Sequence, residues 1–528
     1  MRATRLMAAW ALLCAAIPAA AAITALDISS VQPYGTFGPG KYVRIEGEAH
    51  GALSPSEPIP GLDKAPRDTA GLVEYRAPVT LIVPESPRAG NGTLLVDVPN
   101  RGRAISHGLY NSPRARPVAV GSLDQGTGFL EERGYSIAVV QWEMGEGPTL
   151  PAFTDAARGR LYAEGVGFAA VRDVALFLRE AKGPGNPLAG AIERAYVVGY
   201  SQTARFVKSF LLDGFNEAGG RMVFDGLHIV NAAAGVIPLL DTGPGPGTVA
   251  WETPGHSNPE LRGVHEEPFT WADAMKAASS KYRKLPLVVV NNTYNDYMGG
   301  RASLARTGTH APSEAGIPGN VRIYDIAGAP HTMSRDKNKD CNEGQGQIDW
   351  APALRAELVA LDEWVRGKRD PPGSRLFALE ARSADAEVFQ APAYLRGAVA
   401  MFPELDADHN PASGVMLPDI AVPIASHGYM NSPLTVMACR QAGTYRPFMH
   451  AATQRNAKND ARLSLEERYP GGINDYVTRV RVAASGLVAD RLLLADDAAV
   501  IVNAAAENPA FAPTKPRARG ATSAPAPR

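Results

Sequence analysis

The stretch AYVVGYSQTAR, residues 195–205, decides the fold class of this chain, because an apolar run turns into a helix at a serine. Residues 195–199 have the length and composition of a buried strand, and apolar residues recur at helical spacing after Ser201. A serine at such a turn adopts a strained backbone conformation, so small residues must flank it. The stretch therefore predicts a nucleophilic serine, with an ordinary helix N-cap serine as the alternative.

The residues next to the serine match the usual G-x-S-x-G pattern only in part. Gly199 occupies the first glycine position, whereas Thr203 stands in place of the second glycine. The strand before the serine and the helix after it support the interpretation despite this departure. We therefore predict that Ser201 is the nucleophile, and that the backbone N–H of Gln202 stabilises the oxyanion formed when it attacks a carbonyl group.

Apolar runs of strand length alternate with helical stretches on both sides of this turn, which is typical of parallel strands joined by crossover helices. Helical spacing predicts sheet-covering helices over residues 167–181 and 352–367, with Arg172, Asp173 and Arg179 available for the polar face of the first. The fold class is therefore α/β, with a mostly parallel central sheet flanked by helices. The predicted strands are residues 93–98, 135–141, 195–199, 227–230, 285–290 and 321–326.

Changes in composition along the chain predict how it is organised. Residues 23–90 form a β-rich N-terminal flank, and residues 91–370 form the α/β core. Within the core, residues 231–284 are interrupted by a Gly-Pro run and are predicted to form an inserted lid. Residues 371–507 are predicted to be an extension packed on the core, and residues 508–528 a disordered tail rich in Pro, Ala and Arg.

Residues 1–22 have the pattern of a secretory signal peptide, with a basic start, an apolar run and small residues before Ala22. The apolar run is shorter than the about 20 residues that span a bilayer, which disfavours an anchor helix. We therefore expect export to the periplasm or the medium, and no membrane span in the mature chain. Removing Cys14 with the leader leaves Cys341 and Cys439, for which we predict a disulfide.

The charge balance argues against nucleic acid or membrane surfaces as partners. The chain of 528 residues has 53 Lys and Arg against 54 Asp and Glu, a formal net charge of −1. Binding to phosphate backbones or anionic lipids needs an uncompensated excess of Lys and Arg. The sequence does not predict an oligomeric state.

A serine hydroxyl needs a histidine to take its proton and a carboxylate to orient that histidine. In hydrolases of this architecture they follow the serine in the order acid, then histidine. His331 follows the last predicted strand through a short loop, and Asp296 is the first carboxylate after the strand before it. The alternatives are a loop histidine packed by Met333 and a turn aspartate. We predict that His331 is the base and Asp296 the orienting acid.

A second oxyanion donor is expected from the loop after residues 93–98. Gly102 allows the backbone to approach a substrate closely, but Arg101 or Arg103 could supply the donor instead. A glycine turn with solvated arginines is an equally good interpretation of this loop.

Four aromatic residues are candidates for the wall of a substrate pocket, with packing in the core as the alternative for each. They are Tyr200, Trp251, Phe269 and Trp271. Neither a metal nor a cofactor is predicted, because the chain has no His-Glu-x-x-His, Walker or Cys-x-x-Cys motif. Residues 406–410 begin like a calcium loop, but Pro411 occupies the required glycine position, so a turn is expected.

The chain resembles the bacterial α/β-hydrolase-domain proteins whose nucleophile turn reads Gly-Tyr-Ser-Gln-Ser/Thr-Gly-Arg. The resemblance implies the α/β-hydrolase fold, Ser201 and His331 as nucleophile and base, and an ester-cleaving activity. Ala204 stands where the family has glycine, and Tyr294 stands where an acidic residue is expected, which leaves Asp296 as the carboxylate of its loop. Further shared segments are residues 98–102, 168–173, 214–217, 223–226, 327–331 and 463–469.

The sequence therefore predicts an exported serine hydrolase that cleaves a small-molecule carboxylic ester through an acyl-enzyme, without a cofactor. An acyltransferase with the same three residues and an inactive binding protein with this fold are the alternatives.

An eight-residue pattern, Ser-His-Gly-x-x-Asn-Ser-Pro, occurs at residues 106–113 and again at residues 426–433. Two copies do not make a repeat protein. From the sequence alone, the two occurrences are explained either by similar turns or by chance.

Overall fold

The structure is a computed structural model of the chain. The predicted signal peptide lies outside the described residues except for Ala22, and most of the predicted lid also lies outside them. The described residues are 22–112, 123–143, 147–149, 163–232, 234–237, 270–299, 301–307, 316–333, 339–383 and 399–512.

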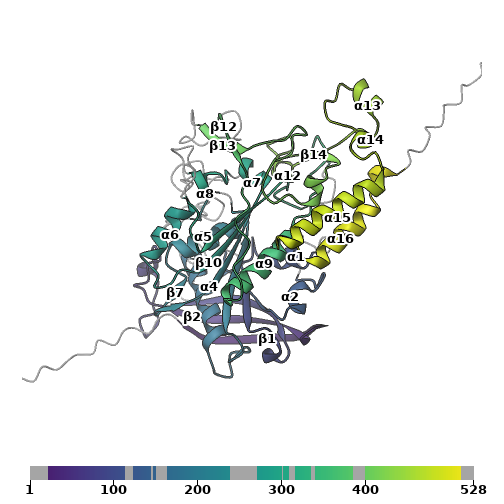
Figure 1. Cartoon of the computed structure of the whole chain (residues 1–528). Helices are drawn as coiled ribbons and strands as arrows, with labels where there is room; N and C mark the ends of the chain where they lie inside the picture. The colour runs from purple at the N-terminus through teal and green to yellow at the C-terminus, as the bar shows by residue number, and fades with distance from the viewer. Residues whose placement is uncertain are drawn as a thin grey trace, which may run out of the picture.

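A nine-stranded sheet forms the centre of the molecule (Figure 1). Its six predicted strands are parallel and run in the order β5-β4-β6-β9-β10-β11, which confirms the α/β class. They are apolar on both faces because helices cover both faces. These strands are β4 (Thr93–Asp97), β5 (Ser136–Val140), β6 (Arg194–Tyr200), β9 (Gly226–Val230), β10 (Leu287–Thr293) and β11 (Val321–Ile326).

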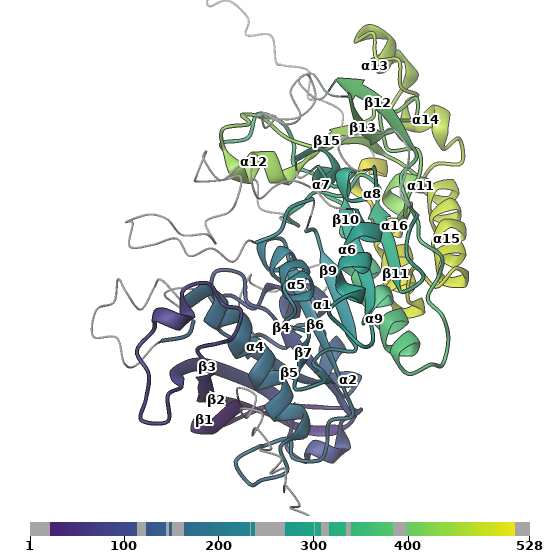
Figure 2. The same cartoon turned by 90° about the vertical axis from the view of Figure 1, so that its left-hand side faces the viewer.

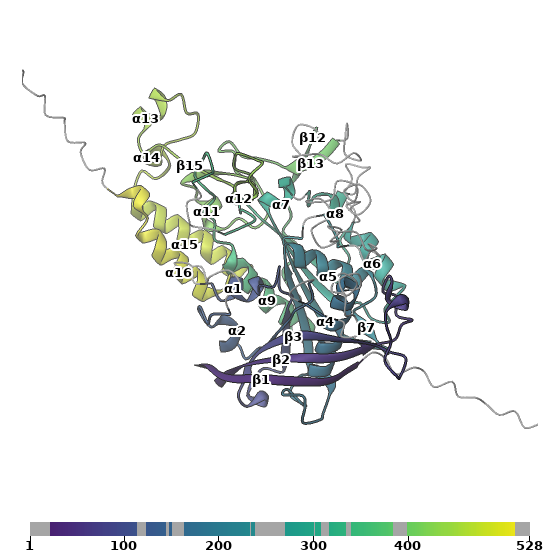
Figure 3. The same ribbon diagram turned by 180° about the vertical axis from the view of Figure 1, so that it is seen from behind.

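The N-terminal β-rich segment extends this same sheet. Strands β1 (Ala22–Phe37), β2 (Gly40–Leu53) and β3 (Val73–Pro84) form an antiparallel meander. Residues 79–82 of β3 pair antiparallel with β5, so the meander continues the sheet beyond its parallel part. Figure 3 shows the three strands side by side at one end of the molecule.

Helices cover the two faces of the sheet (Figure 1). Their side chains and those of the strands form two separate apolar cores. Successive strand residues point to opposite faces, so Leu94 and Val96 enter one core and Leu95 the other. One face carries α4 (Ala163–Glu180), α5 (Gln202–Leu212) and α6 (Trp271–Ser279), and the other carries α1 (Ile105–Tyr110), α2 (Phe129–Glu132) and α9 (Ala351–Val365).

The prediction that Arg172 and Asp173 lie on a polar face of α4 is wrong, because both side chains are buried. The connection from β2 to β3 covers this side of the helix and places Glu57 2.7 Å from the Arg172 guanidinium. Arg172 also pairs with Asp173 at 2.7 Å, and the Tyr75 hydroxyl donates to Asp173 at 3.0 Å. The charges are therefore paired inside the protein.

The C-terminal part packs on the far edge of the sheet and on α9 (Figure 2). Residues 375 and 415 form bridges with β11, and Arg355 of α9 pairs with Asp497 of α16 at 2.6 Å. Its elements are β12 (Leu379–Ser383), β13 (Val399–Pro403), α11 (Pro418–Ala421), β14 (Ala425–Gly428), α12 (Met437–Ala442), β15 (Thr444–Pro447), α13 (Ala452–Ala457), α14 (Leu465–Arg468), α15 (Ile473–Ala489) and α16 (Ala495–Ala506).

The first residues of the predicted disordered tail are ordered. The short helix η5 (Pro509–Phe511) places the Phe511 ring 4.9 Å from the ring of Tyr476 and 5.7 Å from that of Tyr469. Phe511 supplies apolar surface to the cluster beneath α14 and α15, which the tail's overall composition did not indicate. Residues 513–528 lie outside the described part of the chain.

Shorter elements complete the described chain, and none of its described helices is long and apolar enough to cross a bilayer. The shorter elements are η1 (Leu62–Lys64), η2 (Pro87–Ala89), β7 (Glu217–Ala218), β8 (Arg221–Met222), α7 (Tyr294–Gly299) and α8 (Leu304–Thr307).

Candidate active site

Ser201 lies at a sharp turn between β6 and α5, at the carboxyl edge of the parallel strands. Its backbone has φ 58° and ψ −111°, a conformation that costs a residue with a side chain about 1–3 kcal/mol. The turn is held by a hydrogen bond from the Ser201 N–H to the carbonyl of Val230 at 2.8 Å, and by one from the Arg205 N–H to the Ser201 carbonyl at 3.2 Å. The strained turn presents the hydroxyl at the end of the sheet.

Gly199 and Thr203 make this turn possible. A Cβ atom on Gly199 would lie 2.2 Å from the carbonyl oxygen of Thr203, so no side chain fits there. The Thr203 hydroxyl accepts a hydrogen bond from the Tyr200 N–H at 2.9 Å and donates one to the Tyr200 carbonyl at 3.1 Å. Thr203, which departs from the usual motif, therefore stabilises the turn through its side-chain hydroxyl.

The structure brings Ser201, His331 and Asp296 into one line of contacts. His331 Nε2 lies 2.9 Å from Ser201 Oγ, and His331 Nδ1 lies 2.7 Å from Asp296 Oδ1. The other oxygen of Asp296 accepts hydrogen bonds from the N–H and hydroxyl of Thr293, at 3.0 and 2.6 Å. Because an ionised carboxylate only accepts, Nδ1 carries a proton and Nε2 can accept the serine proton.

The loop that carries His331 is fixed by polar contacts to its backbone. The Tyr200 hydroxyl donates to the His331 carbonyl at 2.6 Å, and the Asn231 side chain donates to the same oxygen at 3.3 Å. Burial raises the pKa of the Tyr200 phenol, which keeps this donor protonated. The Trp350 indole donates to the Pro330 carbonyl at 3.0 Å. Tyr200, predicted only as a pocket residue, thus also positions the histidine.

The loop after β4 folds as a tight turn from Asn100 to Arg103. The N–H of each of these two residues donates to the carbonyl of the other, at 2.8 and 3.1 Å. The central residues Arg101 and Gly102 have φ of 50° and 75°, as in a type I′ turn. Within the described part of the chain, the N–H groups of both central residues donate to no acceptor. The turn therefore offers backbone donors beside Ser201.

A cavity of about 200 Å³ opens over Ser201 and His331. Arg101, Arg103 and Gln202 line the cavity, whereas Gly102 does not. Of the candidates for the second oxyanion donor, the two arginines therefore lie at the cavity wall and Gly102 does not. The structure also places several residues here that the sequence did not single out. These additional lining residues are Asn100, Ile105, Leu109, Arg205, Thr332, Met437 and Gln441, and Met333, considered above only as a packing residue, also lines the cavity.

The family model described as alpha/beta hydrolase domain matches residues 42–503. The chain belongs to the alpha/beta hydrolase domain family. No match is found among the curated proteins.

Several solved structures show some similarity to this alpha/beta hydrolase. Esterase Est22 is 14% identical with a TM-score of 0.26, over 48% of this chain and 67% of the other. Acetyl xylan esterase 1 from Thermoanaerobacterium sp. JW/SL YS485 is 11% identical with a TM-score of 0.29, over 59% and 83%. A fungal esterase from Rhizomucor miehei is 10% identical with a TM-score of 0.31, over 58% and 83%.

Of the other predicted pocket aromatics, Trp271 is described by the structure, and it does not line this cavity. Trp271 is buried in the core of the alpha/beta hydrolase, where Lys208 Nζ lies 5.8 Å from its ring. It belongs to α6, which packs on α5, so the end of the predicted lid is part of the helical layer. Trp251 and Phe269 lie outside the described residues.

The predicted disulfide connects the cavity wall to the segment that follows His331. Cys341 and Cys439 are bonded with an S–S distance of 2.05 Å. Cys439 lies on α12, the helix that contributes Met437 and Gln441 to the cavity. The bond therefore ties part of the C-terminal extension to the core.

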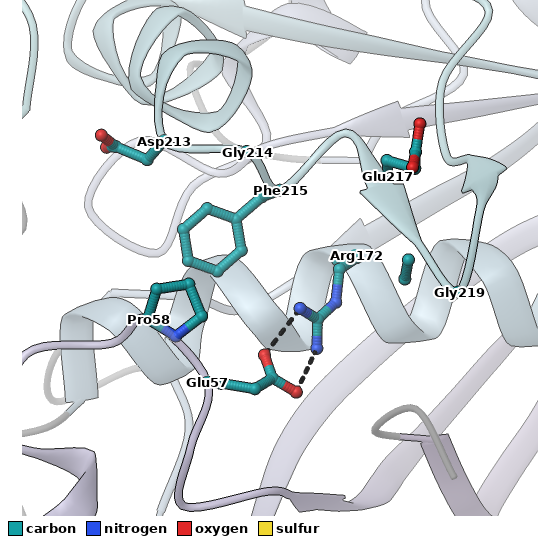
Figure 4. A pocket seen from close by; sticks show the side chains of 9 residues that line it. Glu57, Pro58, Arg172, Asp213, Gly214, Phe215, Glu217 and Gly219 are labelled. Carbon is teal, nitrogen blue, oxygen red and sulfur yellow. Dashed lines mark hydrogen bonds and ion pairs between the residues drawn. The ribbon is translucent and has the colours of Figure 1, made fainter. Parts of the chain in front are cut away.

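A second cavity, of about 280 Å³, lies at the opposite end of α5 (Figure 4). The Arg172 guanidinium points at the Glu57 carboxylate, whereas the Asp213 and Glu217 carboxylates point away from that pair (Figure 4). Glu57 and Asp173 both form ion pairs with Arg172. The positive charge of Arg172 beside this cavity is therefore already neutralised within the protein.

Proposed function

We propose that this alpha/beta hydrolase is a serine esterase that cleaves carboxylic esters through an acyl-enzyme. The observation that carries the proposal is that His331 contacts both other residues. Its Nε2 lies 2.9 Å from Ser201 Oγ, and its Nδ1 lies 2.7 Å from Asp296 Oδ1. Each contact joins side chains from different loops at the carboxyl edge of the sheet, where ligands bind in folds of this kind.

In the first half of the reaction, Ser201 Oγ attacks the ester carbonyl carbon while its proton moves to His331 Nε2. Asp296 accepts from the imidazolium and stabilises its charge. The tetrahedral intermediate collapses when the bond to the alcohol oxygen breaks and His331 returns the proton to that oxygen. The products of this step are the free alcohol and an ester of Ser201.

In the second half, water attacks the acyl group, and His331 takes its proton before returning one to Ser201 Oγ. The charge on the carbonyl oxygen develops beside the amino end of α5 and the Asn100–Arg103 turn. The backbone N–H of Gln202 and that of Arg101 are the donors we assign to it, since both residues line the cavity.

Labelling with a fluorophosphonate probe tests this proposal, because the probe reacts covalently only with an activated serine. We expect the wild-type protein to be labelled and to hydrolyse a short aryl ester, and Ser201→Ala to lose both. Ser279→Ala is the matched control, since Ser279 is an exposed residue at the end of α6. An unlabelled wild type, or label retained in Ser201→Ala, would contradict the proposal. Transfer of the acyl group to an added alcohol in preference to water would favour an acyltransferase.

We also propose that the protein is exported. The leader-like composition of residues 1–22 and the disulfide between Cys341 and Cys439 support this. N-terminal sequencing of the protein from the exported fraction should find a chain that begins after Ala22. An intact leader on protein retained in the cytoplasm would contradict export.

A further inference from the structure

The cavity over Ser201 has an unusual balance of charge. Three arginines, Arg101, Arg103 and Arg205, are among its described lining residues, and no carboxylate is. Asp296 lies behind His331 and does not line the cavity. A neutral ester gains little from three guanidinium groups, whereas an anion gains a charge-assisted hydrogen bond from each guanidinium group it reaches.

Arg205 is held at the cavity wall by the same turn that presents the nucleophile. It lies one helical turn after Ser201, and residues four apart share a helix face. Its Nε donates to the carbonyl of Ala232 at 3.3 Å, and its side chain lies against Gly235. The guanidinium is therefore positioned before a substrate arrives, which reduces the entropy lost on binding.

Arg101 and Arg103 approach the cavity from the turn after β4. The Arg101 guanidinium donates to the side-chain oxygen of Asn100 at 3.1 Å, which keeps its charge next to the predicted oxyanion donors. Among the described residues that line the cavity, no carboxylate lies beside Arg101 or Arg103. Within this described lining, the positive charge of the two arginines is not balanced by a carboxylate.

The rest of the wall is partly apolar. Ile105 and Leu109 of α1, Met333 after the histidine, and Met437 of α12 line it. A cavity of about 200 Å³ with apolar and cationic walls suits a short ester that has a hydrocarbon part and one anionic group.

We propose that the preferred substrates are esters that carry a carboxylate a few bonds from the scissile ester group. The proposal rests on the proposed esterase function and specifies its substrate class. A guanidinium binds a carboxylate through two parallel hydrogen bonds, which fixes the orientation of the substrate as well as adding affinity. The carboxylate belongs either to the acyl part or to the alcohol part.

Two matched substrate pairs test the proposal and distinguish these two sources. Monomethyl glutarate and its amide analogue differ by one charge on the acyl side, and 3-acetoxypropanoate and its amide differ by one charge on the alcohol side. We expect kcat/KM to be about tenfold or more higher for the acid in at least one pair, the value typical of a hydrogen bond to a charged group. Ratios near one or below in both pairs would overturn the proposal while leaving esterase activity intact.

Arginine variants identify the groups responsible. Arg103→Gln and Arg205→Gln should each lower the acid-to-amide ratio severalfold. Arg479→Gln removes the same charge from the exposed face of α15, where it pairs with Asp475, and should leave the ratio unchanged. An unchanged ratio in the Arg103→Gln/Arg205→Gln double variant would refute the assignment of Arg103 and Arg205 as the carboxylate-binding groups.

A binding measurement separates this inference from the catalytic proposal. Ser201→Ala should bind glutarate more tightly than glutaramide by about tenfold in calorimetry, whether or not the wild type hydrolyses esters. Equal binding of the two compounds would overturn the inference. Preferential glutarate binding without any fluorophosphonate labelling of the wild type would contradict the esterase proposal alone.

Discussion

The side-chain amide of Asn100 donates a buried hydrogen bond to the carbonyl oxygen of Tyr200 at 3.0 Å. Tyr200 directly precedes Ser201, so this bond links the turn after β4 to the turn that carries the nucleophile. A fixed spacing between nucleophile and oxyanion donors is a requirement for acyl transfer, because the carbonyl group must reach both at once.

Replacing Asn100 with leucine should therefore impair catalysis more than substrate binding. We expect Asn100→Leu to lower kcat about 100-fold, the effect of displacing a reacting group by about 1 Å. The rate of fluorophosphonate labelling should fall in parallel, while the circular dichroism spectrum stays that of the wild type. A kcat within twofold of the wild-type value would show that the bond does not set the spacing.

Ser201 and His331 should act as one unit in kinetics. Ser201→Ala and His331→Ala should each lower kcat by about 10⁴-fold or more, and the double variant should be little worse than either. The reason is that the hydroxyl is a poor nucleophile without its base, and the base has no proton to take without the hydroxyl. Steady-state rates on one aryl ester measure this. Losses that multiply in the double variant would mean that the two residues act independently.

The turn geometry predicts opposite effects for two glycine substitutions. Gly199→Ala should destabilise the protein by about 3 kcal/mol, since the new methyl group meets the Thr203 carbonyl and the backbone must move. Gly486→Ala, within α15, should stabilise it by roughly 0.5–1 kcal/mol, because nothing lies within 4 Å of the added carbon. Chemical denaturation of both variants provides the measurement. Equal stability of Gly199→Ala and wild type would contradict the tight turn.

Lys208 should make stability depend on pH. Burial, with a contribution from the charge of Arg205, lowers the pKa of Lys208 from 10.5 to about 7. Between these values the unfolded chain binds more protons than the folded one, so the free energy of unfolding rises with pH. Lys208→Met should stabilise the protein at pH 7 by roughly 2–4 kcal/mol, and this gain should shrink as the pH approaches 10.

Denaturation midpoints at pH 7 and pH 9.5 measure this dependence. Lys276→Met is the control, because Lys276 is exposed on the neighbouring helix α6. A Lys208→Met variant whose advantage is the same at both pH values would contradict the buried, destabilised charge.

Chain order and hydrophobic period were enough to predict the six parallel strands of the sheet and to select the three residues of the candidate catalytic site, but not that the N-terminal strands extend the same sheet. Each parallel strand is a local apolar run, and loops that follow such strands meet at one edge of the sheet. Ser201, Asp296 and His331 each follow a strand, so the strand pattern by itself predicts that they lie close together. The period did not show that Arg172 and Asp173 would be buried, since the covering residue, Glu57, lies 115 positions away from Arg172.

The Ser-His-Gly-x-x-Asn-Ser-Pro pattern, which occurs twice in the chain, shows that a local sequence does not determine its own secondary structure. The copy at residues 106–113 contributes to helix α1, whereas the copy at residues 426–433 begins in strand β14. Asn111 is buried and donates to Glu131, and Asn431 is buried and donates to backbone carbonyls including that of Gly443. The same residues adopt different structures because distant partners satisfy their polar groups.

The sequence by itself determined the α/β class, the strained serine turn and the order of the candidate catalytic residues. Tertiary structure alone decided that Trp271 is a core residue, that Arg205 faces the cavity, and that α12 supplies Met437 and Gln441 to it. The physical reason is that the periodicity of apolar residues and the conformations of turns depend on residues only a few positions apart in the sequence. The wall of a cavity, in contrast, is built from side chains whose neighbours lie hundreds of positions apart.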